Sequence, residues 1–366
     1  MLSQADNDLL TRIGPGTGAG NLLRCFWQPF ALSSELSSSQ PLRVRVLGEE
    51  LVARRRADGT VHVDHHPAQD RGGVLWAYFG DREPPELPHL EWTRVPAANR
   101  FVSKRIQFCN YLQNVEGEVD SSHVSFLHSR SDASASAEGR GGSIDTTYMA
   151  RDKTPRFFVL PTEFGVMIGA RRAAEADSYY WRITQFLMPT YTMIPATPGG
   201  TVSFTAAVPI DDVQMLGFTV TWHPDRPLSA AELAEIQSWT GIHTEVDPRT
   251  FVPLRNRDNE YLIDRALQRS RRSYTGIRGI REEDLAVQES MGPICDRTTE
   301  HLGSADLGVI AMRRRLLEAI HALADDGQVP YEAQHPEAYR VRSAAVVLPR
   351  DVPWEEGAAE AMLAPI

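Results

Sequence analysis

The sequence predicts an α+β fold in which an antiparallel sheet is followed by a long helix. Between about residues 143 and 223 several short β-prone runs follow one another, and in one of them apolar residues occupy every second position: Val202, Phe204, Ala206 and Val208. This period is typical of strands with one buried face. No helical pattern separates the runs, so we expect the strands to pair antiparallel.

Helices are predicted to dominate from Ser229 onward. The strongest pattern is an apolar stripe at three- and four-residue steps, formed by Val309, Met312, Leu316, Ile320 and Leu323. Ser304 is the expected N-cap of this helix, with Asp306 in its first turn. Strands followed by helices indicate a curved antiparallel sheet with a long helix packed against it.

A smaller β unit is predicted ahead of this domain. Residues 1–40 have the character of a loop with a short helix, and short β-prone runs begin at Leu42. A further strand is expected from Gly73 to Phe79. The unit is too short to bury much core unless it packs against the rest. We place the domain boundary near residue 90, between an N-terminal segment of residues 1–90 and a larger domain of residues 91–366.

Composition narrows the partners and the compartment. The 366 residues include 38 basic and 48 acidic side chains, a formal net charge of −10, which argues against nucleic acid or an anionic membrane as partner. The N-terminus lacks a signal-peptide pattern, and no apolar run is long enough to cross a membrane. Three widely spaced cysteines fit a reducing cytoplasm better than a disulfide framework. We therefore expect a cytoplasmic protein.

The most informative stretch runs from Asn114 to His128, within a segment of predicted helix over residues 110–130. Two imidazoles and one carboxylate on one face of a metal suit ferrous iron that must also bind dioxygen, and His123 and His128 are the candidate imidazoles. Residues five apart lie about 140° apart on an ideal helix, so both can reach one ion only if the helix contains a π-type bulge or a break. On spacing alone, chance pairing among 11 histidines is an open alternative.

The whole string is more specific than the histidine pair. It reads Asn-x-Glu-Gly-x-x-Asp-x-x-His, then four residues, then His. It resembles the iron-binding helix of Rieske-type non-haem iron oxygenase large (alpha) subunits. The resemblance implies that His123 and His128 bind mononuclear Fe(II), that Asp120 bridges towards the electron-donating cluster, and that Asn114 neighbours the open coordination face.

The resemblance extends to two further segments, from Gly14 to Pro29 and from Glu283 to Ile294, and there it favours the branch of phthalate dioxygenases and aromatic O-demethylases. It implies that Asp284 is the third iron ligand. Rival carboxylates are Asp296, Glu289 and Glu300, and helix capping is the alternative role for Asp284. The implied fold is a helix-grip (START/Bet v 1-like) catalytic domain preceded by a truncated remnant of the Rieske β domain.

The ligands of the family's 2Fe-2S cluster are missing. Such a cluster needs two cysteines and two histidines, which the family supplies as Cys-x-His and Cys-x-x-His. No histidine stands two or three places after Cys25, Cys109 or Cys295. Between the strands that should flank the cluster loops only His65 and His66 remain, and adjacent residues of a strand point to opposite faces, which disfavours a shared metal.

Two functions follow from these observations. The first is the catalytic component of an oxygenase that hydroxylates or O-demethylates an aromatic acid in aromatic compound catabolism. It would take electrons from a reductase through a Rieske cluster in another chain, within a homo- or hetero-trimer. The alternative is an inactive aromatic-ligand-binding or assembly subunit, and a damaged gene or gene-model artefact is a third reading of the deletion. An arginine in the pocket would suit a carboxylate, and the candidates are Arg171, Arg172 and Arg182.

Overall fold

A large antiparallel sheet forms the centre of the chain. The computed structural model describes residues 1–129, 146–195 and 199–365. Within them the strands run in the order β7-β13-β12-β11-β10-β9-β8, and β14 pairs with β10 beside β11. Their bounds are β7 (Arg100–Gln107), β8 (Arg156–Thr162), β9 (Gly165–Ala173), β10 (Ser178–Leu187), β11 (Tyr191–Met193), β12 (Val202–Asp211), β13 (Gln214–Trp222) and β14 (Ala344–Pro349). The antiparallel prediction is confirmed.

The sequence patterns did not predict two strands of this sheet, β7 and β14. β7 follows a stretch that contains Pro84, Pro85 and Pro88, and it pairs with β13 at the edge of the sheet. β14 follows the long helix in sequence and pairs with β10. The region expected to hold strands from about residue 143 instead begins with a helix, α4 (Thr146–Arg151), and its first strand starts at Arg156. The Ser-, Ala- and Gly-rich composition of residues 131–142 predicts a loop, and this segment lies outside the described residues.

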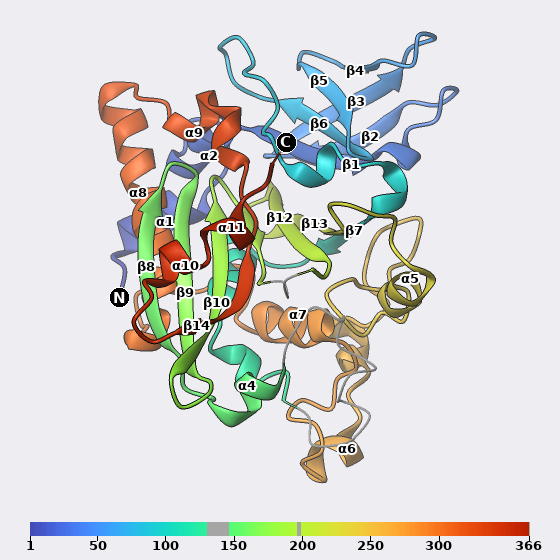
Figure 1. Ribbon diagram of the computed structural model, residues 1–366. Coiled ribbons are helices and arrows are strands. Elements are labelled where there is room, and N and C mark those ends of the chain that lie inside the picture. Colours follow the sequence, from blue (N-terminus) through green and yellow to red (C-terminus); the bar gives the residue numbers. More distant parts are fainter. Residues whose placement is uncertain (130–145, 196–198, 366) are drawn as a thin grey trace.

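The long helix packs against one face of the sheet (Figure 1). α8 (Leu307–Asp326) contacts β8 and β9, and the predicted stripe is buried at Val309, Met312, Leu316 and Ile320. Its start differs from the prediction. Ser304–Asp306 form a 3-10 turn, and Asp306 is the residue before the helix, so the expected N-cap at Ser304 is wrong. The Asp306 carboxylate accepts from the Gly303 amide at 2.6 Å, which stabilises the turn instead.

Two small sheets precede the large one. The strands are β1 (Trp27–Leu32), β2 (Leu42–Val46), β3 (Glu49–Arg55), β4 (Val61–Val63), β5 (Ala68–Arg71) and β6 (Val74–Tyr78), in the orders β1-β6-β5 and β2-β3-β4. Ahead of them lie α1 (Gln4–Thr11) and α2 (Gly18–Arg24). The expectation of only a loop and a short helix over residues 1–40 is therefore wrong, because β1 completes the sheet that β6 centres.

The small sheets share one apolar core with the large sheet. Trp76 of β6 stacks on Trp92 with ring centroids 5.9 Å apart, and Trp92 in turn contacts Phe204 of β12. The turn between β2 and β3 donates a backbone hydrogen bond from Leu47 to Pro209 at the end of β12. This packing supplies the burial that the short β unit could not reach alone. The division near residue 90 stays a prediction.

The remaining helices are short. They are α3 (Tyr111–Val119), α5 (Ala230–Ile236), α6 (Arg265–Arg269), α7 (Ile280–Ser290), α9 (Tyr331–Gln334), α10 (Trp354–Gly357) and α11 (Ala359–Met362). Among the described helices, none has the length and apolar character needed to span a membrane. The architecture is the expected α+β arrangement, in which a small β unit precedes a curved antiparallel sheet with a long helix packed against it.

Candidate metal centre

The segment that carries both histidines is a helix that stops early. α3 starts at its N-cap Asn110, whose side chain accepts from the Leu112 amide at 3.1 Å, and it ends at Val119. Asp120 is extended, and a 3-10 turn, η4 (His123–Ser125), follows. The predicted helix over residues 110–130 is thus too long. The expected interruption exists, and it is a break rather than a π-type bulge.

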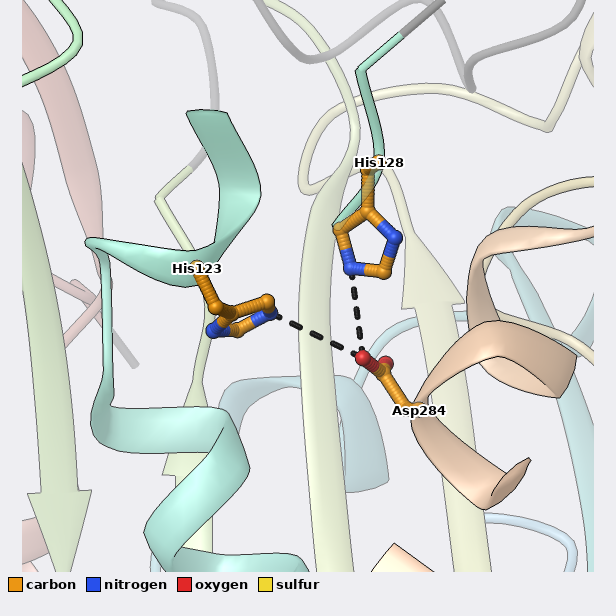
Figure 2. A group of neighbouring side chains, drawn as sticks. All are labelled: His123, His128 and Asp284. Atoms are coloured by element: carbon orange, nitrogen blue, oxygen red, sulfur yellow. Dashed lines mark ion pairs between the residues drawn. The ribbon is translucent and has the colours of Figure 1, made fainter. Parts of the chain in front are cut away.

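The break brings three side chains together (Figure 2). Nε2 of His128 lies 3.2 Å from Oδ1 of Asp284, and Nε2 of His123 lies 3.6 Å from the same oxygen. One ligand atom from each residue falls within 4.8 Å of the others. In the ranges that the structure describes, no other three His, Cys, Asp or Glu side chains meet this criterion. The convergence of residues 123, 128 and 284 is the arrangement that the resemblance predicted.

Each imidazole is oriented by a carboxylate on its other nitrogen. Nδ1 of His123 lies 3.2 Å from Asp120, whose carboxylate also accepts from the backbone amides of Ser122 and His123. Nδ1 of His128 lies 2.6 Å from Oε2 of Glu283. A carboxylate at Nδ1 keeps a proton on that nitrogen, so Nε2 is the nitrogen that would bind a metal once it has lost its own proton, as in many metal sites. Both Nε2 atoms face Asp284.

Asp284 is held on α7, which starts after Gly279. It is the fifth residue of the helix, so it does not cap it, and Arg281 lies one turn earlier with Nη1 3.6 Å from Oδ2 of Asp284. Arg281 also pairs with Glu118 of α3, which links the two helices that carry the site. The buried guanidinium of Arg281 therefore fixes the position of α7 relative to α3.

The charges of this group are strongly coupled. Burial raises the pKa of Asp284, but His128, His123 and Arg281 outweigh it and bring the pKa to about 2. Burial lowers the pKa of His128, but Asp284 and Glu283 outweigh it and raise the pKa to about 9. Without a metal, His128 is therefore cationic at neutral pH. A divalent cation would take the place of that proton.

The rival carboxylates have other partners. Glu289 accepts from the Tyr261 hydroxyl at 2.5 Å and from the Phe108 amide at 3.1 Å. Asp296 is exposed and holds its own turn through Thr298, and Glu300 pairs with Arg313 at 2.6 Å. None of the three belongs to the group around the histidines.

Asn114 lies on α3 and contacts α7. Its side chain is fully buried, and its Nδ2 donates to Oε1 of Gln288 on α7 at 3.2 Å. It does not line the cavity described below. Its role as a neighbour of the coordination face stays a prediction.

Glu283 was not anticipated as a partner of His128. Adjacent residues on a helix point about 100° apart, so the sequence gives no reason for Glu283 and Asp284 to reach the same imidazole. They do so because His128 approaches α7 from the side, with Nδ1 towards one carboxylate and Nε2 towards the other.

A cavity opens beside the three side chains. Its lining includes the group itself, Ser121, Met149, Thr184 and Arg182, together with Ile194, Ile242 and Ile280. Arg182 is 2 % exposed, its Nε donates to the Ser121 hydroxyl at 3.3 Å, and its Nη1 has no hydrogen-bond partner among the described residues. Arg171 lies on the opposite face of the sheet, against the ring of Tyr179.

Arg172, the third candidate arginine, lies near the cavity but does not line it. Arg172 pairs across β9 and β10 with Tyr180 and so shares a sheet face with Arg182. It donates to the backbone carbonyls of Asp152 and Ser121 at 3.1 and 2.9 Å. Within the described ranges, neither Arg172 nor Arg182 forms a salt bridge. The face of the sheet towards His123, His128 and Asp284, which we call the candidate metal group, therefore carries buried positive charge.

The histidines at the deletion form no such centre. His65 has a left-handed backbone, and the ring of His66 packs on Phe79 with centroids 4.6 Å apart. His66 also lies 3.6 Å from Glu49. The three cysteines are free. His66 thus has partners within the small β unit, and neither histidine belongs to a metal-binding group among the described residues.

Comparisons with known proteins identify the family of this chain. The family described as LigXa C-terminal domain like matches residues 77–364. The chain is 30% identical to the 3-chlorobenzoate-3,4-dioxygenase oxygenase subunit of Comamonas testosteroni, covering 97% of each chain. It is 27% identical to the phthalate 4,5-dioxygenase oxygenase subunit of Pseudomonas putida, covering 97% of this chain and 94% of that one.

Solved structures support the fold. The terminal oxygenase of carbazole 1,9a-dioxygenase from Nocardioides aromaticivorans IC177 has a TM-score of 0.51 at 13% identity, covering 86% of this chain and 97% of that one. The oxygenase in a complex with the ferredoxin of carbazole 1,9a-dioxygenase has a TM-score of 0.51 at 14% identity, covering 90% and 94%.

The alignment with the Comamonas relative also bears on the deletion. It extends over 424 positions, more than the 366 residues of this chain, so several dozen positions of that relative have no counterpart here. The relatives are named as dioxygenase, monooxygenase and O-demethylase oxygenase subunits. Their similarity spans both the small β unit and the large domain. The chain therefore belongs to the family of Rieske-type non-haem iron oxygenase alpha subunits, which are oxidoreductases, with a LigXa-like C-terminal domain.

Proposed function

We propose that this chain is the catalytic component of an oxygenase that hydroxylates or O-demethylates an aromatic acid, with Fe(II) bound by His123, His128 and Asp284. The convergence of two Nε2 atoms and one carboxylate oxygen carries this proposal. Two ligand atoms about 2.1 Å from one ion, at roughly a right angle, lie about 3 Å apart. The observed separations of 3.2 and 3.6 Å fit that requirement after small side-chain movements. Two histidines and one carboxylate are the ligand set of non-haem Fe(II) oxygenases.

The bound iron would supply the activation of dioxygen, and the surrounding residues would prepare its ligands. Asp120 and Glu283 would hold the Nδ1 protons and so keep each Nε2 free to bind. Arg281 would hold Asp284 in place from the helix turn before it. The apolar part of the cavity wall consists of Val124, Met149 and the three isoleucines, and the substrate ring would lie against it.

Electrons would come from a Rieske cluster carried by another chain. This chain has no Cys-x-His or Cys-x-x-His sequence of its own. Asp120 is about a quarter exposed and touches Nδ1 of His123, so it offers a short path from the surface to that imidazole. One solved relative of the same fold is an oxygenase in complex with a ferredoxin. A ferredoxin-type or alpha-subunit partner, a reductase and a homo- or hetero-trimer complete the proposal.

The substrate would carry a carboxylate that binds Arg182. A buried guanidinium without a counterion is costly, and a carboxylate would satisfy it with charge-assisted hydrogen bonds. Arg182 lines the cavity of the metal group and has an unpaired Nη1 within the described structure. Relatives named for chlorobenzoate and phthalate fit such a substrate. A methoxylated aromatic acid would fit the same site.

Metal analysis with an electronic spectrum tests the proposal. Anaerobic reconstitution with Fe(II) should give one iron per chain and no iron–sulfur absorption. Asp284→Ala should lower the iron content at least tenfold, and the exposed Asp296→Ala should leave it unchanged. Failure of the unmodified protein to bind iron, or equal loss in both variants, would refute the site.

The missing cluster favours a second candidate, a non-catalytic subunit that binds an aromatic ligand or assists assembly. Its signature would be bound iron with no product when a cluster-bearing partner and a reductase are both supplied. Product formation under those conditions would exclude it.

A further inference from the structure

A second cavity adjoins the one at the metal group. We call the first cavity, which Arg182 and the metal group line, the inner lobe. The outer lobe is the neighbouring cavity, lined among others by Thr221, Ile236, Gly241 and His243. Three isoleucines, Ile194, Ile242 and Ile280, line both. The two lobes therefore share an apolar boundary of three isoleucines, which we call the isoleucine neck, and the outer lobe is the larger.

The outer lobe is unsuited to an anion. In the part of the chain that the structure describes, no lysine or arginine lines it, whereas Glu232 and Glu235 do. The hydrogen bond from Arg226 is the main cause that lowers the pKa of Glu232, to about 2, so this carboxylate is charged at neutral pH. An anionic group would find no cationic side chain along the outer lobe, where Glu232 is already paired with Arg226. Carboxylates also line the inner lobe, at Glu118, Asp120 and Asp284, but there the Arg182 guanidinium offers the anion a cationic partner.

Apart from the two glutamates, the polar side chains of the outer lobe are neutral, and His243 among them is held in place by hydrogen bonds. His243 is 2 % exposed; the Ser103 hydroxyl lies 2.7 Å from its Nδ1 and the Thr221 hydroxyl 2.9 Å from its Nε2. Burial and then the nearby Arg281 and Arg105 lower the pKa of His243 to about 3, so it carries no charge at neutral pH. With the isoleucines, these groups form a wall suited to an uncharged aromatic ring.

We infer that the substrate is a two-ring aromatic acid, with its carboxylate and reacting ring in the inner lobe and a second, uncharged ring in the outer lobe. This inference rests on the proposed function. A single-ring acid would occupy the inner lobe alone and leave the apolar outer lobe in contact with water, which forgoes the gain from burying it. A two-ring acid passes one ring through the isoleucine neck and fills both lobes.

Binding measurements on the full, Fe(II)-reconstituted chain under anaerobic conditions test the inference. Isothermal titration would compare benzoate with 4-phenoxybenzoate and biphenyl-3-carboxylate. We expect at least one two-ring acid to bind tenfold or more tightly than benzoate. Equal affinities for all three would overturn the inference and make the outer lobe an entry path only.

Gly241 allows the outer lobe to be filled selectively. A Cβ added there would meet no atom within 4 Å, and Gly241 is not among the residues with positive φ, so a larger side chain is sterically allowed. Gly241→Phe should abolish the preference for two-ring acids and leave benzoate affinity within twofold. Gly303→Phe is the matched control, because Gly303 is exposed and its added Cβ would meet only Asp306 at 3.8 Å.

A second variant guards against misfolding of the first. Ile236→Trp fills the same lobe from α5, where Ile236 is only partly buried, and it should act as Gly241→Phe does. If the folded variants weaken benzoate and two-ring acids equally, the inference is wrong. Iron content measured on the same samples separates the two ideas. Bound iron without a two-ring preference rejects the inference alone, whereas absent iron rejects the proposed function.

Discussion

Iron and a proton compete for His128. In the metal-free protein Asp284 and Glu283, which outweigh the effect of burial, raise the pKa of His128 to about 9, so its Nε2 is protonated at neutral pH. That proton must leave before the nitrogen can bind a metal. The apparent metal affinity should therefore rise with pH through the neutral range and level off near pH 9.

The size of the effect follows from the pKa. Below pH 9 each pH unit should raise the apparent affinity about tenfold, or about 1.4 kcal/mol, with one proton released from His128 per metal bound. Glu283→Gln removes the carboxylate that lies 2.6 Å from Nδ1 of His128. Loss of such a partner lowers metal affinity by roughly 10–100-fold. The same change lowers the pKa of His128, so the proton competes less with the metal at pH 7. The loss of metal affinity should therefore be smaller at pH 7 than at pH 9.

Titration calorimetry with Co²⁺ as a redox-stable probe measures both quantities. Experiments between pH 6.5 and 9 in two buffers of different ionisation enthalpy give the affinity and the number of protons released. An affinity independent of pH, with no proton released, would refute the argument. So would a Glu283→Gln variant that loses more affinity at pH 7 than at pH 9.

Three further outcomes are expected. The raised pKa of His128 stabilises the metal-free protein fully below about pH 6.5, and this contribution is lost as the pH rises towards 9. The melting temperature of the metal-free protein should therefore fall between these pH values, and that of the metal-loaded protein should change less. Arg182→Lys should weaken benzoate binding at least tenfold by calorimetry, because an ammonium cannot reproduce the planar fork, and Arg171→Lys on the opposite sheet face should not. Trp76→Ala should lower the free energy of unfolding by about 3–5 kcal/mol in denaturant, because Trp76 is 1 % exposed and stacks on Trp92. The small sheets and the large domain should unfold together, and two separate transitions would contradict their shared core.

The sequence alone determined the class of the fold and predicted the candidate residues of the site. Period-two strands and the stripe from Val309 to Leu323 are local patterns, so they predicted the antiparallel sheet and α8 without any contact information. The string from Asn114 to His128 and the match around Asp284 predicted the group of three. The missing cluster ligands were also a property of the sequence, because they are absent residues.

The tertiary structure alone decided what surrounds those residues. The contact of Glu283 with His128 and the shared wall of the two lobes join segments far apart in the chain, so no local pattern encodes them. The choice of Arg182 over Arg171 depends on which sheet face points towards α3. Strand alternation fixes only that the faces differ, and the packing of helices on one face then selects the buried one.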